Sequence, residues 1–135
     1  MPLTHEEAQR AIAATHAKAA ELGIAVTAAV VDEGGHLVAL GRMDKAFPLS
    51  PQIAEAKACS SASLNREGDS LLALSRERPD FFAVIAQMSR VPLIPGIGSK
   101  LLRREGRVLG ALGVSGGKPE QDVECADAAL RALGL

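Results

Sequence analysis

Residues 24–43 read IAVTAAVVDEGGHLVALGRM, and this stretch decides the fold. Its first part, IAVTAAVV, is apolar on both faces and rich in β-branched residues, as is typical of a strand that is covered on two sides. Asp32-Glu33-Gly34-Gly35 then supplies turn residues, with glycine available for positive φ. HLVALGRM returns as a second strand. The stretch therefore predicts a β-hairpin whose second strand ends in polar residues at the rim of a sheet.

The segments around this hairpin predict helices and a second hairpin. Thr4 and Glu7 have the spacing of a capping box, and Gly23 supplies a left-handed stop, so a helix is expected over about 4–22. Ser50 is expected to be the N-cap of the next helix, with Pro51 in its first turn. The remaining patterns predict helices over 51–66, 70–77, 80–88 and 119–133, a hairpin over 100–117 that turns at Glu105-Gly106, and a connection over 91–98 with room for a short edge strand.

The order of these elements is helix, hairpin, helices, hairpin, helix. A doubly wound fold needs strand-helix-strand crossovers, whereas hairpins join antiparallel neighbours. We therefore expect a mostly antiparallel sheet with helices packed on it. The chain of 135 residues has the size of one ordinary domain, so a single domain over 1–135 is expected.

Composition excludes several classes of partner. Fifteen Lys and Arg against sixteen Asp and Glu give a net charge of -1, and the chain has no Trp or Tyr, so neither a basic surface nor a stacking platform for nucleic acid is expected. Charges or glycines interrupt every apolar run before about 18 residues, so no membrane span is expected. The N-terminus MPLTHEEAQR lacks the apolar run of a secretory signal, which favours a cytoplasmic protein. Cys59 and Cys125 are expected to be buried free thiols.

Arg42, Asp44 and Lys57 are the most interesting polar set. Arg42 and Asp44 alternate on one face at the end of a predicted strand, and Lys57 lies on the helix that must return over the sheet. If Lys57 meets Asp44 in a partly buried pocket, the pair can hold a ligand carboxylate or act as acid and base. The alternative is a structural ion pair that anchors the helix to the hairpin.

The three histidines give no zinc pattern. None has a second His or Cys three or four residues away, so a structural zinc site is not expected. His5 is expected in solvent, and His36 is expected to hydrogen-bond beside the turn. His16 lies deeper in its helix, where a surface or packing role and a role as iron ligand both stay open. The glycine-rich residues 113–117 match no phosphate-binding motif, but they precede a helix N-terminus where a carboxylate or propionate can dock.

Three segments occur in a specific order, namely VVDEGGHLVALGRMD, IAEAKACSSA and GRVLGALGVSGGKPEQDVECADAAL. In this order and at these separations they resemble the GlcG/HbpS-like family, which includes the C-terminal domain of PduO proteins. The resemblance implies a profilin-like α/β (α+β) domain with a mostly antiparallel sheet of about five strands flanked by helices, and homo-oligomers from dimer to octamer. It implies binding of haem or a related tetrapyrrole for some members, and for others only genetic association with glycolate, diol or aromatic catabolism.

The resemblance also implies site residues. The positions that match the family's motifs are Asp32, Gly35, Arg42, Met43, Asp44, Lys57, Gly110, Gly113, Ser115, Gly116 and Asp122. A haem-binding relative would place its axial histidine near His16, and the cofactor would lie against Arg42, Met43, Gly98, Ser115 and Gly116. The chain departs from the family at PGIGSKLL, where Gly98 and Ser99 take the place of a glycine pair and Leu101 that of a proline, which alters the wall of the pocket.

Two functions follow as hypotheses. The favoured one is a small-ligand-binding domain that binds haem or a related tetrapyrrole, with His16 as iron ligand and Arg42 or Lys57 holding propionates. The alternative is a small catabolic isomerase, lyase or hydrolase for a carboxylated substrate, with Asp44 and Lys57 as acid and base in a pocket at a subunit interface. A third hypothesis is a domain that only assembles or binds a partner, and no motif in the sequence identifies that partner.

Overall fold

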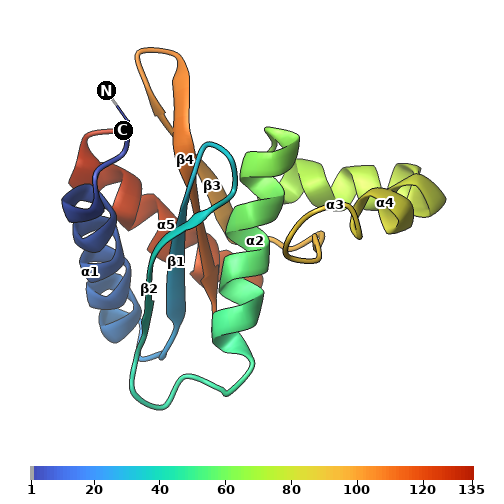
Figure 1. The fold of residues 1–135 in the computed structure, drawn as a ribbon. Helices are drawn as coiled ribbons and strands as arrows, with labels where there is room; N and C mark the ends of the chain where they lie inside the picture. The colour runs from blue at the N-terminus through green and yellow to red at the C-terminus, as the bar shows by residue number, and fades with distance from the viewer. Residues whose placement is uncertain (1) are drawn as a thin grey trace.

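The computed structural model describes residues 2–135 and has one antiparallel sheet with helices on both of its faces (Figure 1). The elements in chain order are α1 (His5–Glu21), β1 (Thr27–Asp32), β2 (Leu37–Arg42), α2 (Ser50–Leu64), α3 (Gly68–Glu77), α4 (Pro79–Ile85), β3 (Ser99–Arg104), β4 (Arg107–Ser115) and α5 (Pro119–Leu133). The strand order is β2-β1-β4-β3, and every pair of neighbours is antiparallel. The predicted fold class is confirmed.

The sheet has four strands within the described residues, whereas the resemblance implied about five. The connection over 91–98, which had room for a short edge strand, forms none. Pro92 and Pro95 lack the backbone N–H that a strand needs on its paired side. This segment is therefore an irregular connection from α4 to β3.

The two faces of the sheet are covered by different helices. Ala28 and Val30 of β1 pack into a core shared with α1 and α5, whereas Val31 packs with Ala58 and Ala62 of α2. This alternation follows from the period of two along a strand. Figure 1 shows the sheet between α1 and α5 on one side and α2 on the other.

Helix α2 lies unusually close to strand β4. A Cβ added at Gly113 would lie 2.2 Å from the carbonyl oxygen of Ala54 and 2.7 Å from the amide nitrogen of Ala58. Only glycine allows two backbones to approach in this way. The close approach sets the Lys57 side chain directly over the end of β4.

The turn predictions are confirmed, and one helix cap is corrected. Glu105 and Gly106 both have positive φ, 53° and 77°, as a two-residue hairpin turn requires. In the first hairpin the Asp32 carboxylate accepts hydrogen bonds from the backbone N–H groups of Gly34 and His36. Ser50 is not an N-cap: it lies inside α2, and its buried hydroxyl hydrogen-bonds that of Thr27 at 2.7 Å.

Helices α3 and α4 extend sideways from the end of α2, away from the sheet (Figure 1). We call residues 68–85 the α3–α4 arm. The arm has its own small core of Leu71, Leu74 and Phe82, and it leaves Phe81 and Val84 exposed. It is therefore held by far less buried apolar surface than the sheet and its three covering helices.

Two further expectations concern the cysteines and the membrane. Cys59 and Cys125 are both free and buried, as predicted. Burial raises the pKa of the Cys125 thiol to about 11, which keeps it protonated at neutral pH. Among the described residues, the helices are all too short or too polar to cross a bilayer. The cytoplasmic location stays a prediction.

Candidate functional site

Lys57 is buried, but its partner is not the predicted one. Its Nζ donates to the carbonyl oxygen of Val114 at 2.7 Å and to Oδ2 of Asp122 at 3.3 Å. Asp122 lies in the first turn of α5, and its Oδ1 accepts from the backbone N–H of Gly117 at 2.9 Å. These contacts tie α2, β4 and α5 together, and we call them the Lys57–Asp122 junction.

The junction is closed to solvent, and burial dominates its titration. Burial lowers the pKa of Lys57 and raises the pKa of Asp122, while the attraction between the two charges opposes both shifts. Gly98 closes one side, because a Cβ there would lie 2.8 Å from Cβ of Asp122 and 3.1 Å from Nζ of Lys57. Gly98, at which the sequence departs from the family's glycine pair, therefore lies against Lys57. The space beside it is already filled by protein.

The expected contact between Lys57 and Asp44 is absent from the described residues, and this expectation was wrong. Asp44 is exposed in the loop between β2 and α2. Lys57 lies seven positions after Ser50, so it is about 10 Å along the helix from the end that this loop reaches. Lys57 instead pairs with Asp122 of α5, so the described residues do not show the alternative of an ion pair that anchors this helix to the first hairpin either.

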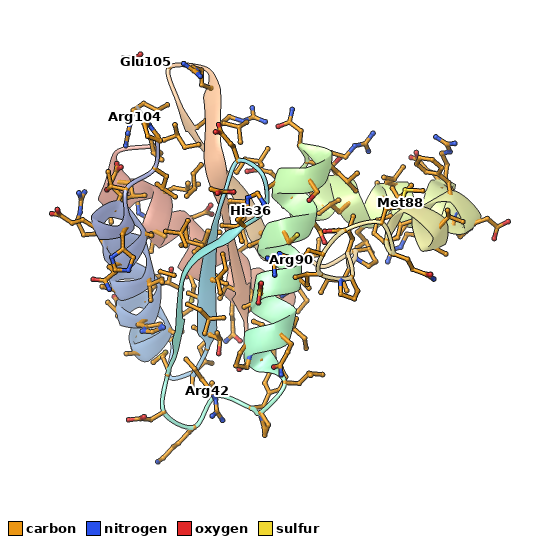
Figure 2. The ribbon with its side chains drawn as sticks, in the orientation of Figure 1. His36, Arg42, Met88, Arg90, Arg104 and Glu105 are labelled. Carbon is orange, nitrogen blue, oxygen red and sulfur yellow. The ribbon has the colours of Figure 1, made fainter. Side chains whose placement is uncertain are left out.

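The other residues expected at a cofactor site are dispersed. Arg42 is exposed beside the loop from β2 to α2, and its guanidinium donates twice to the carbonyl oxygen of Ala46 (Figure 2). Met43 packs at the edge of the main core, where its sulfur accepts from the N–H of Val26 at 3.4 Å. Ser115 and Gly116 lie at the end of β4, opposite the start of β1.

His16 borders an open groove between α1 and the edge strand β2. The groove has a volume of about 340 Å³. Its lining residues are Gln9, Ile12, Ala13, His16, Ala39, Leu40 and Gly41. Nε2 of His16 lies 3.0 Å from the carbonyl oxygen of Gly41. We call this space the His16 groove.

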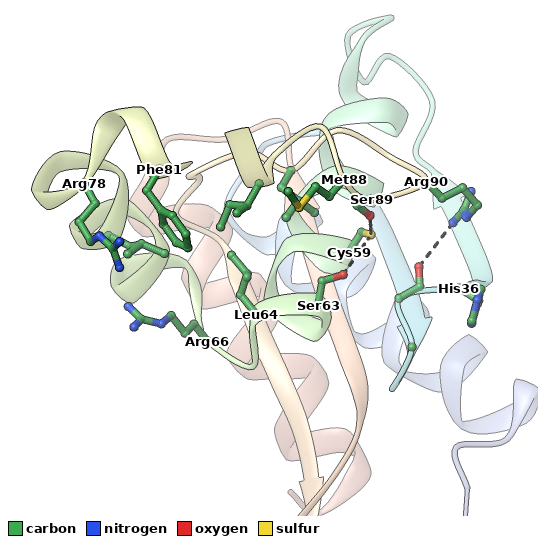
Figure 3. A pocket seen from close by; sticks show the side chains of 15 residues that line it. His36, Cys59, Ser63, Leu64, Arg66, Arg78, Phe81, Met88, Ser89 and Arg90 are labelled. Carbon is green, nitrogen blue, oxygen red and sulfur yellow. Dashed lines mark hydrogen bonds between the residues drawn. The ribbon is translucent and has the colours of Figure 1, made fainter. Parts of the chain in front are cut away.

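A larger cavity, of about 710 Å³, lies between the first hairpin, α2 and the α3–α4 arm (Figure 3). We call it the arm pocket. Its lining residues are Gly34, Gly35, His36, Cys59, Ser63, Leu64, Arg66, Leu74, Arg78, Phe81, Ile85, Met88, Ser89, Arg90 and Leu93. Sequence reasoning missed this pocket because its walls come from three separate segments, and the pattern over 66–93 indicated only short helices.

The described residues contain no group of three or more His, Cys, Asp or Glu side chains that could hold a bare metal ion. His36 instead pairs with Asp32, with Nδ1 3.1 Å from Oδ1. Hydrogen bonds from the backbone of His36 and Gly34 lower the pKa of Asp32, although burial acts in the opposite direction. Of the three histidines, His16 is half-buried, whereas His5 and His36 are exposed.

Comparison with known proteins identifies the family. A family model described as "Haem degrading protein HbpS-like" matches residues 3–131. Protein GlcG of Escherichia coli K12 is 33% identical over 114 residues, which cover 84% of this chain and 81% of GlcG. Corrinoid adenosyltransferase PduO of Citrobacter freundii is 29% identical over all 135 residues, but the chain spans only 40% of its length.

A solved structure supports the fold. The crystal structure of a PduOC:haem complex superposes with a TM-score of 0.87 over 98% of this chain and 95% of that chain, at 24% identity. At that identity the likeness concerns the fold alone. Together with the family match over nearly the whole sequence, it confirms the suspected resemblance, and the chain belongs to the HbpS-like family.

Proposed function

We propose that this chain is a haem-binding domain of a homo-oligomer, with His16 as an axial ligand of the iron. The HbpS-like family is described by haem degradation, and a protein of the same fold forms a haem complex. Haem iron is commonly held by a histidine imidazole, and the protein contributes ring orientation and an apolar pocket. The chain must therefore offer a histidine that is oriented and still accessible.

The hydrogen bond from His16 to Gly41 is the observation that carries this proposal. A carbonyl oxygen only accepts, so Nε2 must carry the proton when it bonds Gly41. In the neutral ring, Nδ1 then keeps its lone pair. A second hydrogen bond that fixes the tautomer and ring orientation is the usual arrangement of a metal-binding histidine. His16 is half-buried, so it is both held and reachable.

The His16 groove fits one side of a tetrapyrrole. Its walls are mostly apolar, with Ile12 and Ala13 from α1 and Ala39 from β2. Strand β2 is at the edge of the sheet, and its side chains Leu37 and Leu40 are exposed. A second copy of the chain would supply the opposite wall there, which makes the proposed site one of the oligomer.

Two residues expected to hold propionates do not fit this groove. Gly41 faces α1 and His16, so Arg42, the next residue on β2, points to the opposite face of the sheet. Lys57 is engaged in the Lys57–Asp122 junction. The propionates would therefore reach solvent or the second copy, and roles for Met43, Gly98, Ser115 and Gly116 at the cofactor stay predictions.

The three histidines provide a matched experiment. Haem is titrated into the wild-type chain and into His16→Ala, His5→Ala and His36→Ala, and the Soret band and the mass of the haem-loaded protein are measured. We expect the shifted Soret band to be lost only in His16→Ala, because His5 is exposed in the first turn of α1 and His36 lies at the hairpin turn. Loss of the band in His36→Ala alone would move the iron to the arm pocket and contradict the assignment.

The catabolic-enzyme alternative is not favoured by the geometry. It requires Asp44 and Lys57 to share a pocket, and the structure separates them. Lys57 also lines neither the His16 groove nor the arm pocket. Catalytic roles for these two residues stay predictions.

A further inference from the structure

We infer that the arm pocket is a second binding site, and that it takes a small organic acid with an apolar body and one anionic group. The inference is independent of haem at His16, because none of the arm-pocket residues lines the His16 groove. It rests on the size of the pocket, the sign of its charges and the distribution of polar groups along it.

The pocket has the dimensions of a small-molecule site. A volume of about 710 Å³ falls in the range in which proteins hold drug-sized ligands. The apolar part of the lining consists of Leu64, Leu74, Phe81, Ile85, Met88 and Leu93. These side chains come from α2, α3, α4 and the connection after α4, so a bound molecule would be held between the arm and the body of the protein.

The charged side chains that line the pocket are all basic. Arg66, Arg78 and Arg90 are cationic, and the lining includes no Asp or Glu. The whole chain has a net charge of -1, so this is a local excess rather than a consequence of composition. A cavity lined by one sign of charge concentrates ligands of the opposite sign.

The excess of positive charge is strongest at one end of the arm pocket. Arg90 is paired with Glu55 at 3.3 Å, and His36 is paired with Asp32 at 3.1 Å. In contrast, Arg66 and Arg78 have no acidic group within 4.0 Å among residues 2–135. Figure 3 shows these two arginines at the end of the pocket remote from Arg90 and His36. The anionic group of the ligand would therefore lie at the Arg66 and Arg78 end.

Arg78 is held in place without a carboxylate. Its guanidinium carbon lies 4.0 Å from the centre of the Phe81 ring, a cation–π contact that leaves its N–H groups free. Arg66 donates a long hydrogen bond of 3.4 Å to the hydroxyl of Ser70. A planar guanidinium with free N–H groups binds carboxylates and related oxyanions in a bidentate manner. The Phe81 ring beside it offers a flat apolar surface for the ligand body.

The middle of the pocket carries neutral polar groups. The Cys59 thiol lies 3.3 Å from the Ser89 hydroxyl and 3.7 Å from the Ser63 hydroxyl. The hairpin turn covers this cluster closely, because a Cβ added at Gly35 would lie 3.2 Å from both Sγ of Cys59 and Oγ of Ser63. These hydroxyls can orient a polar substituent at the far end of the ligand. An acid with an apolar body and a small polar tail matches the whole length of the pocket.

The probe for a first test is anilinonaphthalene sulfonate, which joins an aromatic body to one anionic group and fluoresces when it leaves water. The full chain is titrated with the probe, and we expect saturable binding of one probe per chain. Bound probe is then displaced with phenylacetate or with phenylacetamide, which share an aromatic body and differ in charge. Phenylacetate should displace the probe and phenylacetamide should do so at least about tenfold less well, since a charged hydrogen bond contributes about a factor of ten or more in affinity.

Variants then locate the site. Arg66→Gln and Arg78→Gln should each weaken probe binding about tenfold, whereas Arg103→Gln, an exposed arginine on β3, should leave it unchanged. Ser63→Phe keeps every charge but fills the cavity, and should abolish binding while far-UV circular dichroism stays the same. Equal weakening by Arg103→Gln, equal displacement by both competitors, or absence of saturable binding would overturn the inference.

The same probe separates this site from the haem site. Probe binding should be unchanged in His16→Ala, and haem binding should be unchanged in Ser63→Phe. If His16→Ala abolished probe binding, both ligands would share one site and the inference would be overturned. If His16→Ala kept both haem and probe binding, the proposed function would lose its iron ligand while the arm pocket would stand.

Discussion

Helix α2 borders two polar regions, and they differ in whether their charged groups are already paired within the protein. On the side that faces the sheet, Lys57 is buried, and its ammonium group hydrogen-bonds to Val114 and Asp122. On the side that faces the α3–α4 arm, Ser63 lines an open cavity whose cationic residues Arg66 and Arg78 have no acidic partner among residues 2–135. In this protein a buried charge therefore has a structural role, and the available charges lie where the packing is open.

The largest expected effect is at the Lys57–Asp122 junction. Lys57→Met leaves the Asp122 carboxylate buried without its cation, so the free energy of unfolding should fall by about 3–5 kcal/mol at pH 7. Urea denaturation followed by circular dichroism measures this loss. Lys100→Met is the matched control, because Lys100 pairs with Asp127 at 3.7 Å on the surface and should lose at most about 1 kcal/mol.

A double variant tests whether the lost charge pairing is the cause. Asp122→Asn removes the charge but keeps an oxygen that can accept from the N–H of Gly117. The double variant Lys57→Met/Asp122→Asn should therefore be more stable than Lys57→Met alone.

The pH dependence of Lys57→Met has the same origin. Burial raises the pKa of Asp122, so the deficit in the free energy of unfolding of Lys57→Met should shrink as the pH falls through that raised pKa and the carboxyl becomes neutral. A deficit that is constant from pH 7 to pH 4 would contradict this account.

The second prediction concerns the weaker core of the α3–α4 arm. Leu71→Ala removes a fully buried side chain from a cluster of only three buried residues and should cost about 2 kcal/mol, at the lower end for such a change because so small a cluster can relax. Hydrogen exchange should show faster exchange within residues 68–85, while strands β1 and β4 keep their protection. Equal loss of protection in the sheet would show that the arm and the body unfold as one unit.

A third prediction concerns an ion pair on the body of the protein. Glu7 caps α1 together with Thr4 and pairs with Arg104 of β3. The hydrogen bond from Arg104 is the largest of the contacts that lower the pKa of Glu7. Because the folded state then prefers the ionised form of Glu7, the contribution of Glu7 to stability is present above about pH 4.5. This contribution is lost as the pH falls through the lowered pKa.

Glu7→Gln should therefore cost about 1 kcal/mol at pH 7, and its difference from wild type should narrow below pH 4. Thermal unfolding between pH 3 and pH 7 measures both values. Glu6→Gln is the control, because Glu6 is exposed in the same helical turn. A difference between Glu7→Gln and wild type that widens in acid would have the wrong sign for a carboxylate with a lowered pKa.

Local signals in the sequence predicted the elements well. The two hairpin turns and the capping box of Thr4 and Glu7 depend on residues within four positions of one another, so their patterns can be recognised without knowledge of the fold. Local signals could not decide whether the connection over 91–98 contains a short edge strand, because tolerance of Pro92 and Pro95 depends on which side of the segment would be paired. Such information exists only in the folded sheet.

The candidate site was harder to predict because its contacts are distant in sequence. Lys57 and Asp122 are separated by 65 positions, and nothing local distinguishes Asp122 from Asp44 as the partner of a buried lysine. Arg66 and Arg78 lie in the connections before and after α3 and resemble ordinary solvated charges, and only the packing of the α3–α4 arm against the end of α2 gives them a shared cavity. His16 was predicted from the family resemblance, and its bond to Gly41 required the register of α1 against β2.

The smallest expected effect on stability is at Arg66 and Arg78. Arg66→Gln and Arg78→Gln remove charges that have no acidic partner within the described part of the chain, so each should change the free energy of unfolding by less than about 0.5 kcal/mol. The same urea experiment that detects the loss in Lys57→Met measures this. Three basic residues near one helix would then differ by several kcal/mol solely because one is buried and paired and two are open. A loss above about 2 kcal/mol in either arginine variant would show that these residues support the arm itself, and their free charge would no longer indicate a place for a ligand.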